Sequence, residues 1–182
     1  MMGELILTAP TLEYETEILA FRREMLAAQD EDGFAGCSRL EKYEAVEDWL
    51  DHLAKYASAA SCPNGKVPSD TYLAVRVADD RVVGIIDLRH HIDHPILSLW
   101  GGHIGYSVRP SERGHGYAAE MLRLNLEICR GRGMKKILIT CSPDNPASEK
   151  TIRKNGGVWE KDIVVDGDTV RRFWLTLQQE DG

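Results

Sequence analysis

The sequence predicts a single mixed α/β domain, and three observations lead to this fold class. The first seventy residues carry mostly helical patterns, and from Thr71 the pattern changes to strands separated by turns. Around residues 101–130 a strand-like run, a glycine turn and a helical pattern follow one another. The chain of 182 residues shows no internal repeat or second boundary, so we assign residues 1–182 to one domain with a sizeable core.

The composition is that of an ordinary globular protein. Hydrophobic residues make up 43% and charged residues 28%, and no apolar run approaches the length of a membrane span. The net charge of −7 argues against nucleic acid or an anionic membrane as the main partner. The first residues lack a signal-peptide pattern, so we expect a cytoplasmic protein. The four cysteines have no C-x-x-C or zinc spacing, and we expect Cys129 and Cys141 to be small buried side chains.

The first seventy residues are predicted to form one strand and two helices. Residues 4–8 form the strand, and a helix begins at Pro10-Thr11 with Thr11 as its N-cap. An acidic loop at residues 30–32 follows. An apolar stripe then places the second helix over about residues 40–60.

From Thr71 onward we expect strands, turns and two further helices. Adjacent glycines, Gly101-Gly102, interrupt the strand predicted over residues 96–108, which indicates a bulge or a ligand passing close to the backbone. The other predicted elements are a hairpin over 72–77 and 82–89, a helix over 117–130, a buried strand over 136–141 parallel to the preceding one, a helix over 145–155 and a closing hairpin over 158–165 and 170–177.

Residues 113–118, Arg-Gly-His-Gly-Tyr-Ala, join a strand to a helix through a glycine turn. Backbone N–H groups at such a helix start are unpaired within the helix, and the helix dipole adds partial positive charge. The natural guest is an anion, most often a phosphate. Because Gly114 and Gly116 lack side chains, a diphosphate can approach the backbone closely.

The same residues resemble a known family. Arg113, Gly116 and Ala118 match the pattern Arg/Gln-x-x-Gly-x-Gly/Ala, and a second pattern runs from Asp144 to Ser148 with Gly156 behind it. Together they resemble the acetyl-CoA motifs of the GNAT superfamily of N-acetyltransferases, over roughly residues 72–177. The resemblance implies a GNAT fold. Its central sheet is mixed and mostly antiparallel, helices flank it, and a bulged strand splays from the next, parallel strand at the acetyl-CoA site.

The resemblance also implies an activity, the transfer of an acetyl group from acetyl-CoA to a primary amine by direct attack, without a metal. A backbone N–H near the bulge is expected to bind the developing oxyanion. Because CoA is an anion, this acidic chain needs a local basic region. Its candidates are Arg109, Arg113, His115, Lys150, Arg153 and Lys154. The expected cofactor-binding residues are Tyr106, Ser107, Val108, Arg113, Gly114, His115, Gly116, Tyr117, Ala118, Asn145 (also a plain N-cap before Pro146) and Ser148.

Proton transfer has three candidate residues on the strands that line the expected cleft, namely His103, Tyr106 and Asp87. His103 stands beside the glycine pair, and its unperturbed pKa of about 6.5 suits a base. Many family members carry a Tyr four residues before the last glycine of the second motif, as acid for the leaving thiolate. This chain has Ile152 there, so the thiolate leaves unprotonated or takes its proton from water or another group.

The acceptor is expected to be a cationic amine. In the resembled family the loop that here contains Asp30, Glu31 and Asp32 borders the acceptor site, and acidic residues attract cations over long range. A protein N-terminus, a lysine, a polyamine, an amino acid or a drug all fit this description. Separately, we regard a homodimer as a possible assembly.

Three other interpretations stay open at this stage. The first is a CoA-binding sensor without transfer activity. The second is a dinucleotide-binding protein, because Gly114-x-Gly116-x-x-Ala119 also fits the Gly-x-Gly-x-x-Gly/Ala fingerprint. Antiparallel hairpins before the motif do not suit the doubly wound sheet of that second class. A loop with His90, His91 and His94 is a third possibility, a metal site, although no further ligand is visible in the sequence.

Overall fold

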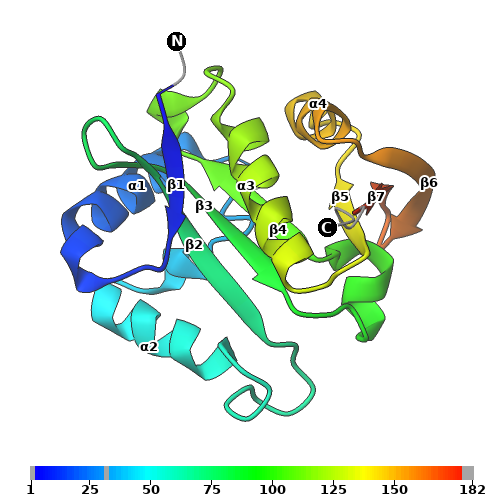
Figure 1. Ribbon diagram of the computed structural model, residues 1–182, viewed down its shortest axis with the longest axis horizontal. Helices are drawn as coiled ribbons and strands as arrows, with labels where there is room; N and C mark the ends of the chain where they lie inside the picture. Colours follow the sequence, from blue (N-terminus) through cyan, green and yellow to red (C-terminus); the bar gives the residue numbers. More distant parts are fainter. Residues whose placement is uncertain (1–2, 31–32, 178–182) are drawn as a thin grey trace.

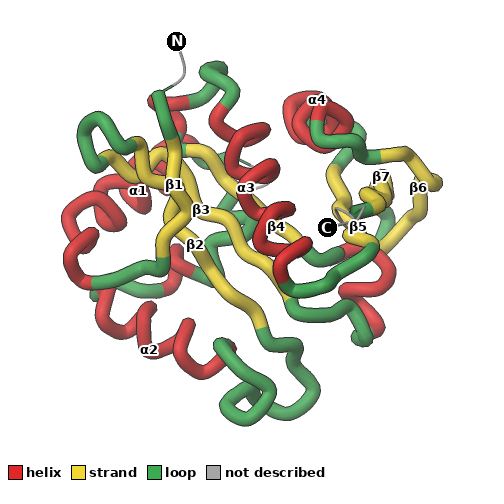
Figure 2. The backbone as a smooth tube through the Cα atoms, in the orientation of Figure 1, coloured by secondary structure: helices red, strands yellow, loops and turns green. Residues whose placement is uncertain are grey.

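The computed structural model describes residues 3–30 and 33–177, which form two antiparallel sheets with helices packed against them (Figures 1 and 2). The sheet orders are β1-β2-β3-β4 and β5-β7-β6. None of the helices in the described residues is long and apolar enough to cross a membrane. In chain order the elements are β1 (Leu5–Thr8), α1 (Glu15–Ala28), α2 (Val46–Tyr56), β2 (Ser69–Arg76), β3 (Arg81–Arg89), β4 (Ile104–Val108), α3 (Tyr117–Gly131), β5 (Lys136–Cys141), α4 (Pro146–Lys154), β6 (Val158–Val165) and β7 (Asp168–Thr176).

The first sheet is buried on both faces, which explains the continuous apolar run of β3. Ile86 on one face of β3 packs in a core with α3, and that core extends across β5 and β7 to α4. Ile85 on the other face packs in a second core with α1 and α2. Figure 1 shows α3 lying across the first sheet and α4 beside the second. A strand covered on both faces reads as unbroken hydrophobic sequence rather than as an alternating pattern.

The two sheets meet at a clasp between His103, which precedes β4, and Leu138 in β5. The N–H of His103 donates to the carbonyl of Leu138 at 2.8 Å, and the N–H of Leu138 donates to Nδ1 of His103 at 2.9 Å. Beyond this clasp β4 and β5 belong to different sheets and form no ladder with each other. The expected splay is therefore present, and it divides the expected central sheet into two.

Two boundaries of the predicted helices are wrong. The helix expected over residues 40–60 is a 3₁₀ turn, Leu40–Lys42, followed by α2 only from Val46. Both Leu40 and Val46 are buried in the second core, and Tyr43 between them has extended backbone. The chain must change direction to bury both. The first helix likewise starts with a 3₁₀ turn, and the side chain of Thr11 makes no capping bond.

The strand predicted over residues 96–108 is also wrong before Ile104. Leu97–Gly101 form a short π-helical turn instead. Its carbonyl groups are held by side chains of the sheets, because Arg172 donates to Ser98 O at 2.6 Å and Arg89 donates to Gly101 O at 2.9 Å. The other predicted strands, the helices over 117–130 and 145–155, and the burial of Cys129 and Cys141 are confirmed.

The loop after α1 crosses β4 at very close range. The hydroxyl of Ser107 donates to the carbonyls of Ala35 (2.7 Å) and Gly33 (3.2 Å). Gly36, with φ of 73°, lies so near the backbone of Gly105 that a Cβ would stand 2.1 Å from its carbonyl oxygen. Only glycine fits this crossing, so the loop is fixed against the strand that lines the cleft described below.

We expect Gly36→Ala to destabilise the fold much more than Gly65→Ala. Both glycines have nearly the same positive φ, 73° and 74°, but no atom lies within 4 Å of a Cβ at Gly65. Alanine at Gly65 should cost about 1 kcal/mol of backbone strain, whereas at Gly36 the clash should add about 1–3 kcal/mol more. Urea unfolding of both variants measures the difference, and equal losses would contradict the close crossing.

We also expect the His103 clasp to weaken at low pH. Burial lowers the pKa of His103 from its ordinary 6.5 to about 4. Between these two pH values the unfolded chain binds a proton at this residue and the native protein does not. The stability that this group contributes is complete above pH 6.5 and is lost as the pH falls toward 4, by up to about 1.4 kcal/mol per pH unit. His103→Asn keeps an acceptor without titrating. The difference in unfolding free energy between wild type and variant should decrease as the pH is lowered from 6.5 toward 4. A difference that does not change with pH would contradict the assignment.

Candidate active site

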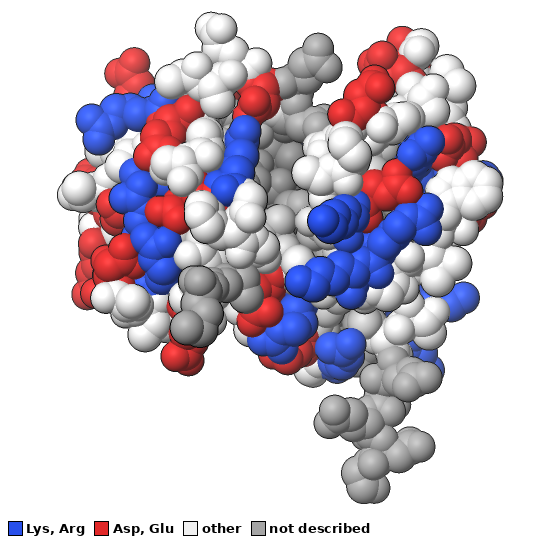
Figure 3. All heavy atoms as spheres, turned by 90° about the horizontal axis from the view of Figure 1, so that it is seen from above, with Lys and Arg blue, Asp and Glu red and all other residues white. Residues whose placement is uncertain are grey.

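A cleft of about 840 Å³ opens between the diverging strands. One wall consists of β4 and the start of α3, the other of the end of β5 and α4, and the loop after α1 closes one side. Figure 3 looks onto this region from above and shows a hollow with basic side chains gathered along one of its walls. The charged residues that line the cleft are Asp30, Glu112, Arg113, Asp144, Lys150 and Lys154.

The N-terminus of α3 faces this cleft with free backbone donors. Gly116 occupies the N-cap position and no side chain caps the helix, so the first N–H groups of α3 have no partner within it. Gly114 has φ of 80°, and no atom lies within 4 Å of the place where its Cβ would stand. The turn is therefore open toward the cleft and suited to an anion.

Buried ion pairs hold this turn in place from behind. The carboxylate of Glu112 accepts from Arg76 at 2.8 Å and lies 2.6 Å from Nε of Arg81. Arg109, whose side chain is only 5% exposed, pairs with Glu17 at 2.8 Å and with Glu24 at 2.6 Å. Arg109 is thus committed to structure and is not part of a basic region for a ligand.

Two residues expected at the phosphate site have partners within the protein. Arg113 lines the cleft, but its Nε donates to the carbonyl of Val108 at 3.1 Å and its outer nitrogen pairs with Asp30 at 2.5 Å. The ring of His115 turns back to the carbonyl of Glu112 and does not line the cleft. The donors that remain available to an anion here are mainly backbone N–H groups, with Lys150 and Lys154 on the opposite wall.

Strand β4 offers further backbone donors to the cleft. Arg89 N–H donates to the carbonyl of His103 and Arg109 N–H donates to that of Val83, which fixes the hydrogen-bonding phase of the β3–β4 ladder. Because this phase alternates, Tyr106 and Val108 turn their N–H and C=O groups away from β3, toward the gap. The bond from Arg113 to the Val108 carbonyl agrees with this phase. The backbone N–H and C=O groups of Ser107 face β3 instead, and its side-chain hydroxyl anchors the loop after α1.

The hydroxyl of Tyr106 meets the first turn of α4 inside the cleft. It lies 2.9 Å from the hydroxyl of Ser148, and burial raises the pKa of Tyr106. Asn145 caps α4 as expected, since its side chain accepts from the N–H of Ser148 at 3.0 Å. Ile152 is fully buried in the core, so a proton donor at the usual motif position is absent here.

The structure does not bring His103 and Asp87 into the cleft. Both are almost fully buried, and neither is among the residues that line it. Nδ1 of His103 is occupied by the N–H of Leu138, and Oδ1 of Asp87 accepts from the N–H of Gly105 at 2.7 Å. Burial raises the pKa of the Asp87 carboxyl. Each holds β4 in position, one at its start and one at Gly105.

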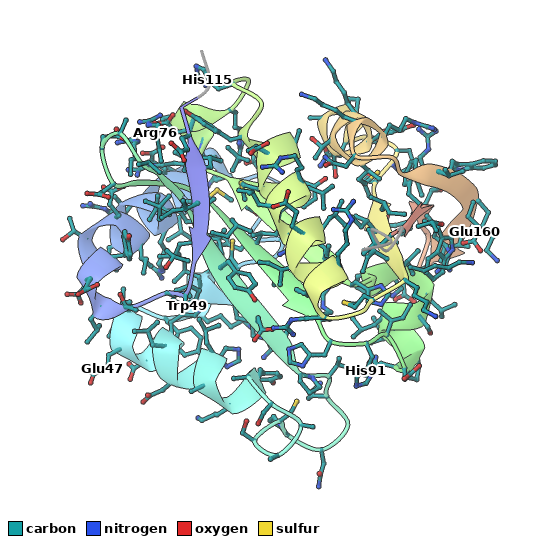
Figure 4. All side chains as sticks on the ribbon, in the orientation of Figure 1. Glu47, Trp49, Arg76, His91, His115 and Glu160 are labelled. Atoms are coloured by element: carbon teal, nitrogen blue, oxygen red, sulfur yellow. The ribbon has the colours of Figure 1, made fainter. Side chains whose placement is uncertain are left out.

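The histidine loop is a separate region. Nε2 of His90 lies 2.8 Å from the carboxylate of Asp70, and Figure 4 shows His91 at the opposite end of the molecule from His115. Among residues 3–30 and 33–177, no group of three or more His, Cys, Asp or Glu side chains is arranged to hold a metal ion.

Sequence reasoning identified Asn145 and Ser148 on the α4 wall and the loop with Asp30, but it missed the residues that β5 and the rest of that loop contribute. Thr140 and Ser142, at the end of β5, line the wall, and polar residues at the end of a buried strand were the available signal. Gly33 and Ala35 enter the cleft only because Gly36 permits the crossing over β4. That contact depends on a close approach between residues about seventy positions apart, which no local pattern encodes.

Comparison with known proteins places this architecture. The chain is similar to solved structures that include Mycobacterium smegmatis RimJ in complex with CoA-disulfide, with a TM-score of 0.69 and 21% identity, covering 99% of this chain and 85% of that one. It is also similar to the spermidine N-acetyltransferase of Vibrio cholerae in complex with CoA and spermine, with a TM-score of 0.64 and 15% identity, covering 94% and 95%.

A third similar structure is an acetyltransferase from Salmonella typhimurium that modifies the N-terminal serine of ribosomal protein L7/L12. Its TM-score is 0.63 and its identity 18%, covering 96% of this chain and 95% of that one. No curated protein matches. The model of the acetyltransferase (GNAT) domain matches residues 5–158, which is most of the chain. The chain therefore belongs to the GNAT family of acetyltransferases.

Proposed function

We propose that this protein transfers the acetyl group of acetyl-CoA to a cationic primary amine. The observation that carries the proposal is the cleft between β4 and β5, which has free backbone donors both at the α3 N-terminus and along β4. An elongated ligand with a diphosphate at one end and a thioester at the other matches this arrangement. The open turn at Gly114 and the uncapped helix fit the diphosphate.

Different residues of the cleft bind different parts of acetyl-CoA. The N–H groups of residues 114–118 hold the diphosphate, and Lys150 and Lys154 add positive charge on the facing wall. Tyr106 and Val108 bind the pantetheine arm through their backbone, and Asn145 and Ser148 border it from α4. His115 supports the turn through Glu112.

The chemistry is a direct attack. The amine nitrogen forms a bond to the thioester carbonyl carbon, and the carbonyl electron pair moves onto oxygen, where a β4 N–H group stabilises it. The C–S bond then breaks and the thiolate leaves. Since His103 and Asp87 lie outside the cleft, we assign removal of the ammonium proton to water. The Tyr106 hydroxyl, hydrogen-bonded to Ser148, supplies a proton to the thiolate; the acetylated nitrogen releases its extra proton to water, and water returns a proton to the tyrosinate.

The acceptor class is inferred from charge and from the relatives. One similar structure is a spermidine acetyltransferase with spermine bound, and another modifies a protein N-terminal serine. Both acceptors carry amines that are cationic before they react. The net charge of −7 attracts such molecules. Glu31 and Asp32 of the expected acidic loop lie outside the described residues, and Asp30 is paired with Arg113.

A panel of amines tests the activity, with free-thiol release from acetyl-CoA as the readout. We expect release with one or more cationic amines, such as polyamines, lysine-containing peptides or peptides with a free N-terminus. A sensor would bind acetyl-CoA and release no thiol with any amine in the panel.

Gly114→Glu should weaken CoA binding by at least about tenfold, because it puts a negative charge at the proposed diphosphate site. Gly133→Glu is the matched control. Gly133 also has a positive φ, 73° against 80°, and open space around it, but it follows the other end of α3. Isothermal titration with CoA measures both variants. Equal affinities of the two would contradict the placement of the diphosphate.

Tyr106→Phe should lower kcat by about tenfold to a hundredfold while KM for acetyl-CoA changes little, because only the proton donor is removed. Tyr72→Phe, the same chemical change at a partly buried tyrosine that does not line the cleft, is the control. Steady-state kinetics with the best amine of the panel gives both constants. A folded Tyr106→Phe protein with an unchanged kcat would remove the tyrosine from the mechanism.

A further inference from the structure

Asp30 and Arg113 form an ion pair at the edge of the proposed cofactor site. The outer nitrogen of Arg113 lies 2.5 Å from Oδ2 of Asp30, and both residues line the cleft. Nε of Arg113 donates to the carbonyl of Val108 at 3.1 Å, and Nη2, the nitrogen that pairs with Asp30, also lies 3.8 Å from the sulfur of Met25. The side chain of Arg113 is therefore oriented with Nη2 toward Asp30.

This pair differs from the other ion pairs around the same turn. Each of those pairs has one nearly buried member, since the side chains of Arg109 and Glu112 are exposed by only 5% and 11%, whereas their partners are exposed by 20–30%. The side chains of Arg113 and Asp30 are exposed by 43% and 36%. Removing one member of a buried pair strongly destabilises the protein, whereas an exposed pair contributes little to stability and exchanges partners readily.

Asp30 is carried by the loop that also closes the cleft. It follows Gln29, the left-handed C-cap of α1, and its carbonyl accepts from the N–H of Gly33 at 3.1 Å. The chain then continues to Ala35, whose carbonyl is anchored by Ser107 of β4. The ion pair thus ties one end of this loop to the phosphate turn, and the hydroxyl of Ser107 ties the next part to β4.

We propose, building on the proposed function, that Asp30 is a resident counter-ion that competes with the diphosphate of CoA for Arg113. A carboxylate and a diphosphate beside one guanidinium repel each other, so cofactor binding and the Asp30–Arg113 pair oppose one another. The competition lowers the affinity for CoA and favours release of the product. When the cofactor binds, the carboxylate of Asp30 leaves Arg113 and becomes available at the mouth of the cleft to a cationic acceptor.

The test is a double-mutant cycle read by isothermal titration with CoA, which lacks an acetyl group to transfer. The proteins are wild type, Asp30→Asn, Arg113→Gln and the double variant. Asp93→Asn is the matched control, because it makes the same change of net charge at a side chain that is 93% exposed and lies outside the cleft. Each titration is run at about 50 mM and about 500 mM NaCl, since exposed charges are screened by salt.

Asp30→Asn should bind CoA about threefold tighter than wild type at the lower salt, with a smaller gain at the higher salt. Asp93→Asn should bind as wild type does. In the Arg113→Gln background the Asp30 substitution should lose most of its effect. If wild type binds CoA and Asp30→Asn leaves the affinity unchanged or lowers it, this inference alone is overturned. The same holds if the Asp30 substitution raises the affinity equally in the Arg113→Gln background. Absence of CoA binding by wild type would overturn the proposed function and this inference with it.

Discussion

The structure depends on the pair of hydrogen bonds that joins His103 to Leu138. These bonds bring β4 and β5 together at one point, after which the strands enter different sheets. Strands that separate leave unpaired backbone groups, and buried unpaired groups are costly unless a ligand or water satisfies them. The gap-facing N–H groups of Tyr106 and Val108 are in this situation, whereas the carbonyl of Val108 accepts from Arg113. The same divergence that would weaken a sheet therefore creates a row of donors and acceptors for a ligand.

The polar residues near the cleft fall into two sets, and burial separates them. One set is buried and paired, and it fixes the geometry: Asp87 on Gly105, Arg109 on Glu17 and Glu24, and Glu112, which also borders the cleft, on two arginines. The other set lines the cleft and includes Tyr106, Ser148, Lys150 and Lys154. Removing one member of a buried pair leaves an uncompensated charge, so the first set supports the site without taking part in the reaction.

Much of the fold was predictable because the patterns that specify it are local. The glycine turn before α3, the N-cap at Asn145 and the short strand β5 follow from residues within a few positions of one another. The errors arose where distant groups decide. Leu97–Gly101 turn rather than extend because Arg89 and Arg172 bind their carbonyls. His103 had a suitable unperturbed pKa for a base, but burial lowers that pKa to about 4, and its Nδ1 is occupied by the N–H of Leu138.

The central claim is that the gap between β4 and β5 and the uncapped start of α3 bind one ligand. Backbone amide chemical-shift mapping of the 20.4 kDa protein with CoA tests it directly, because each N–H reports its own hydrogen bond. The largest shifts should fall on Tyr106, Val108 and residues 114–118 together, while those of the histidine loop, residues 90–94, stay unchanged. Shifts confined to the helix start, or centred on the histidine loop, would contradict it.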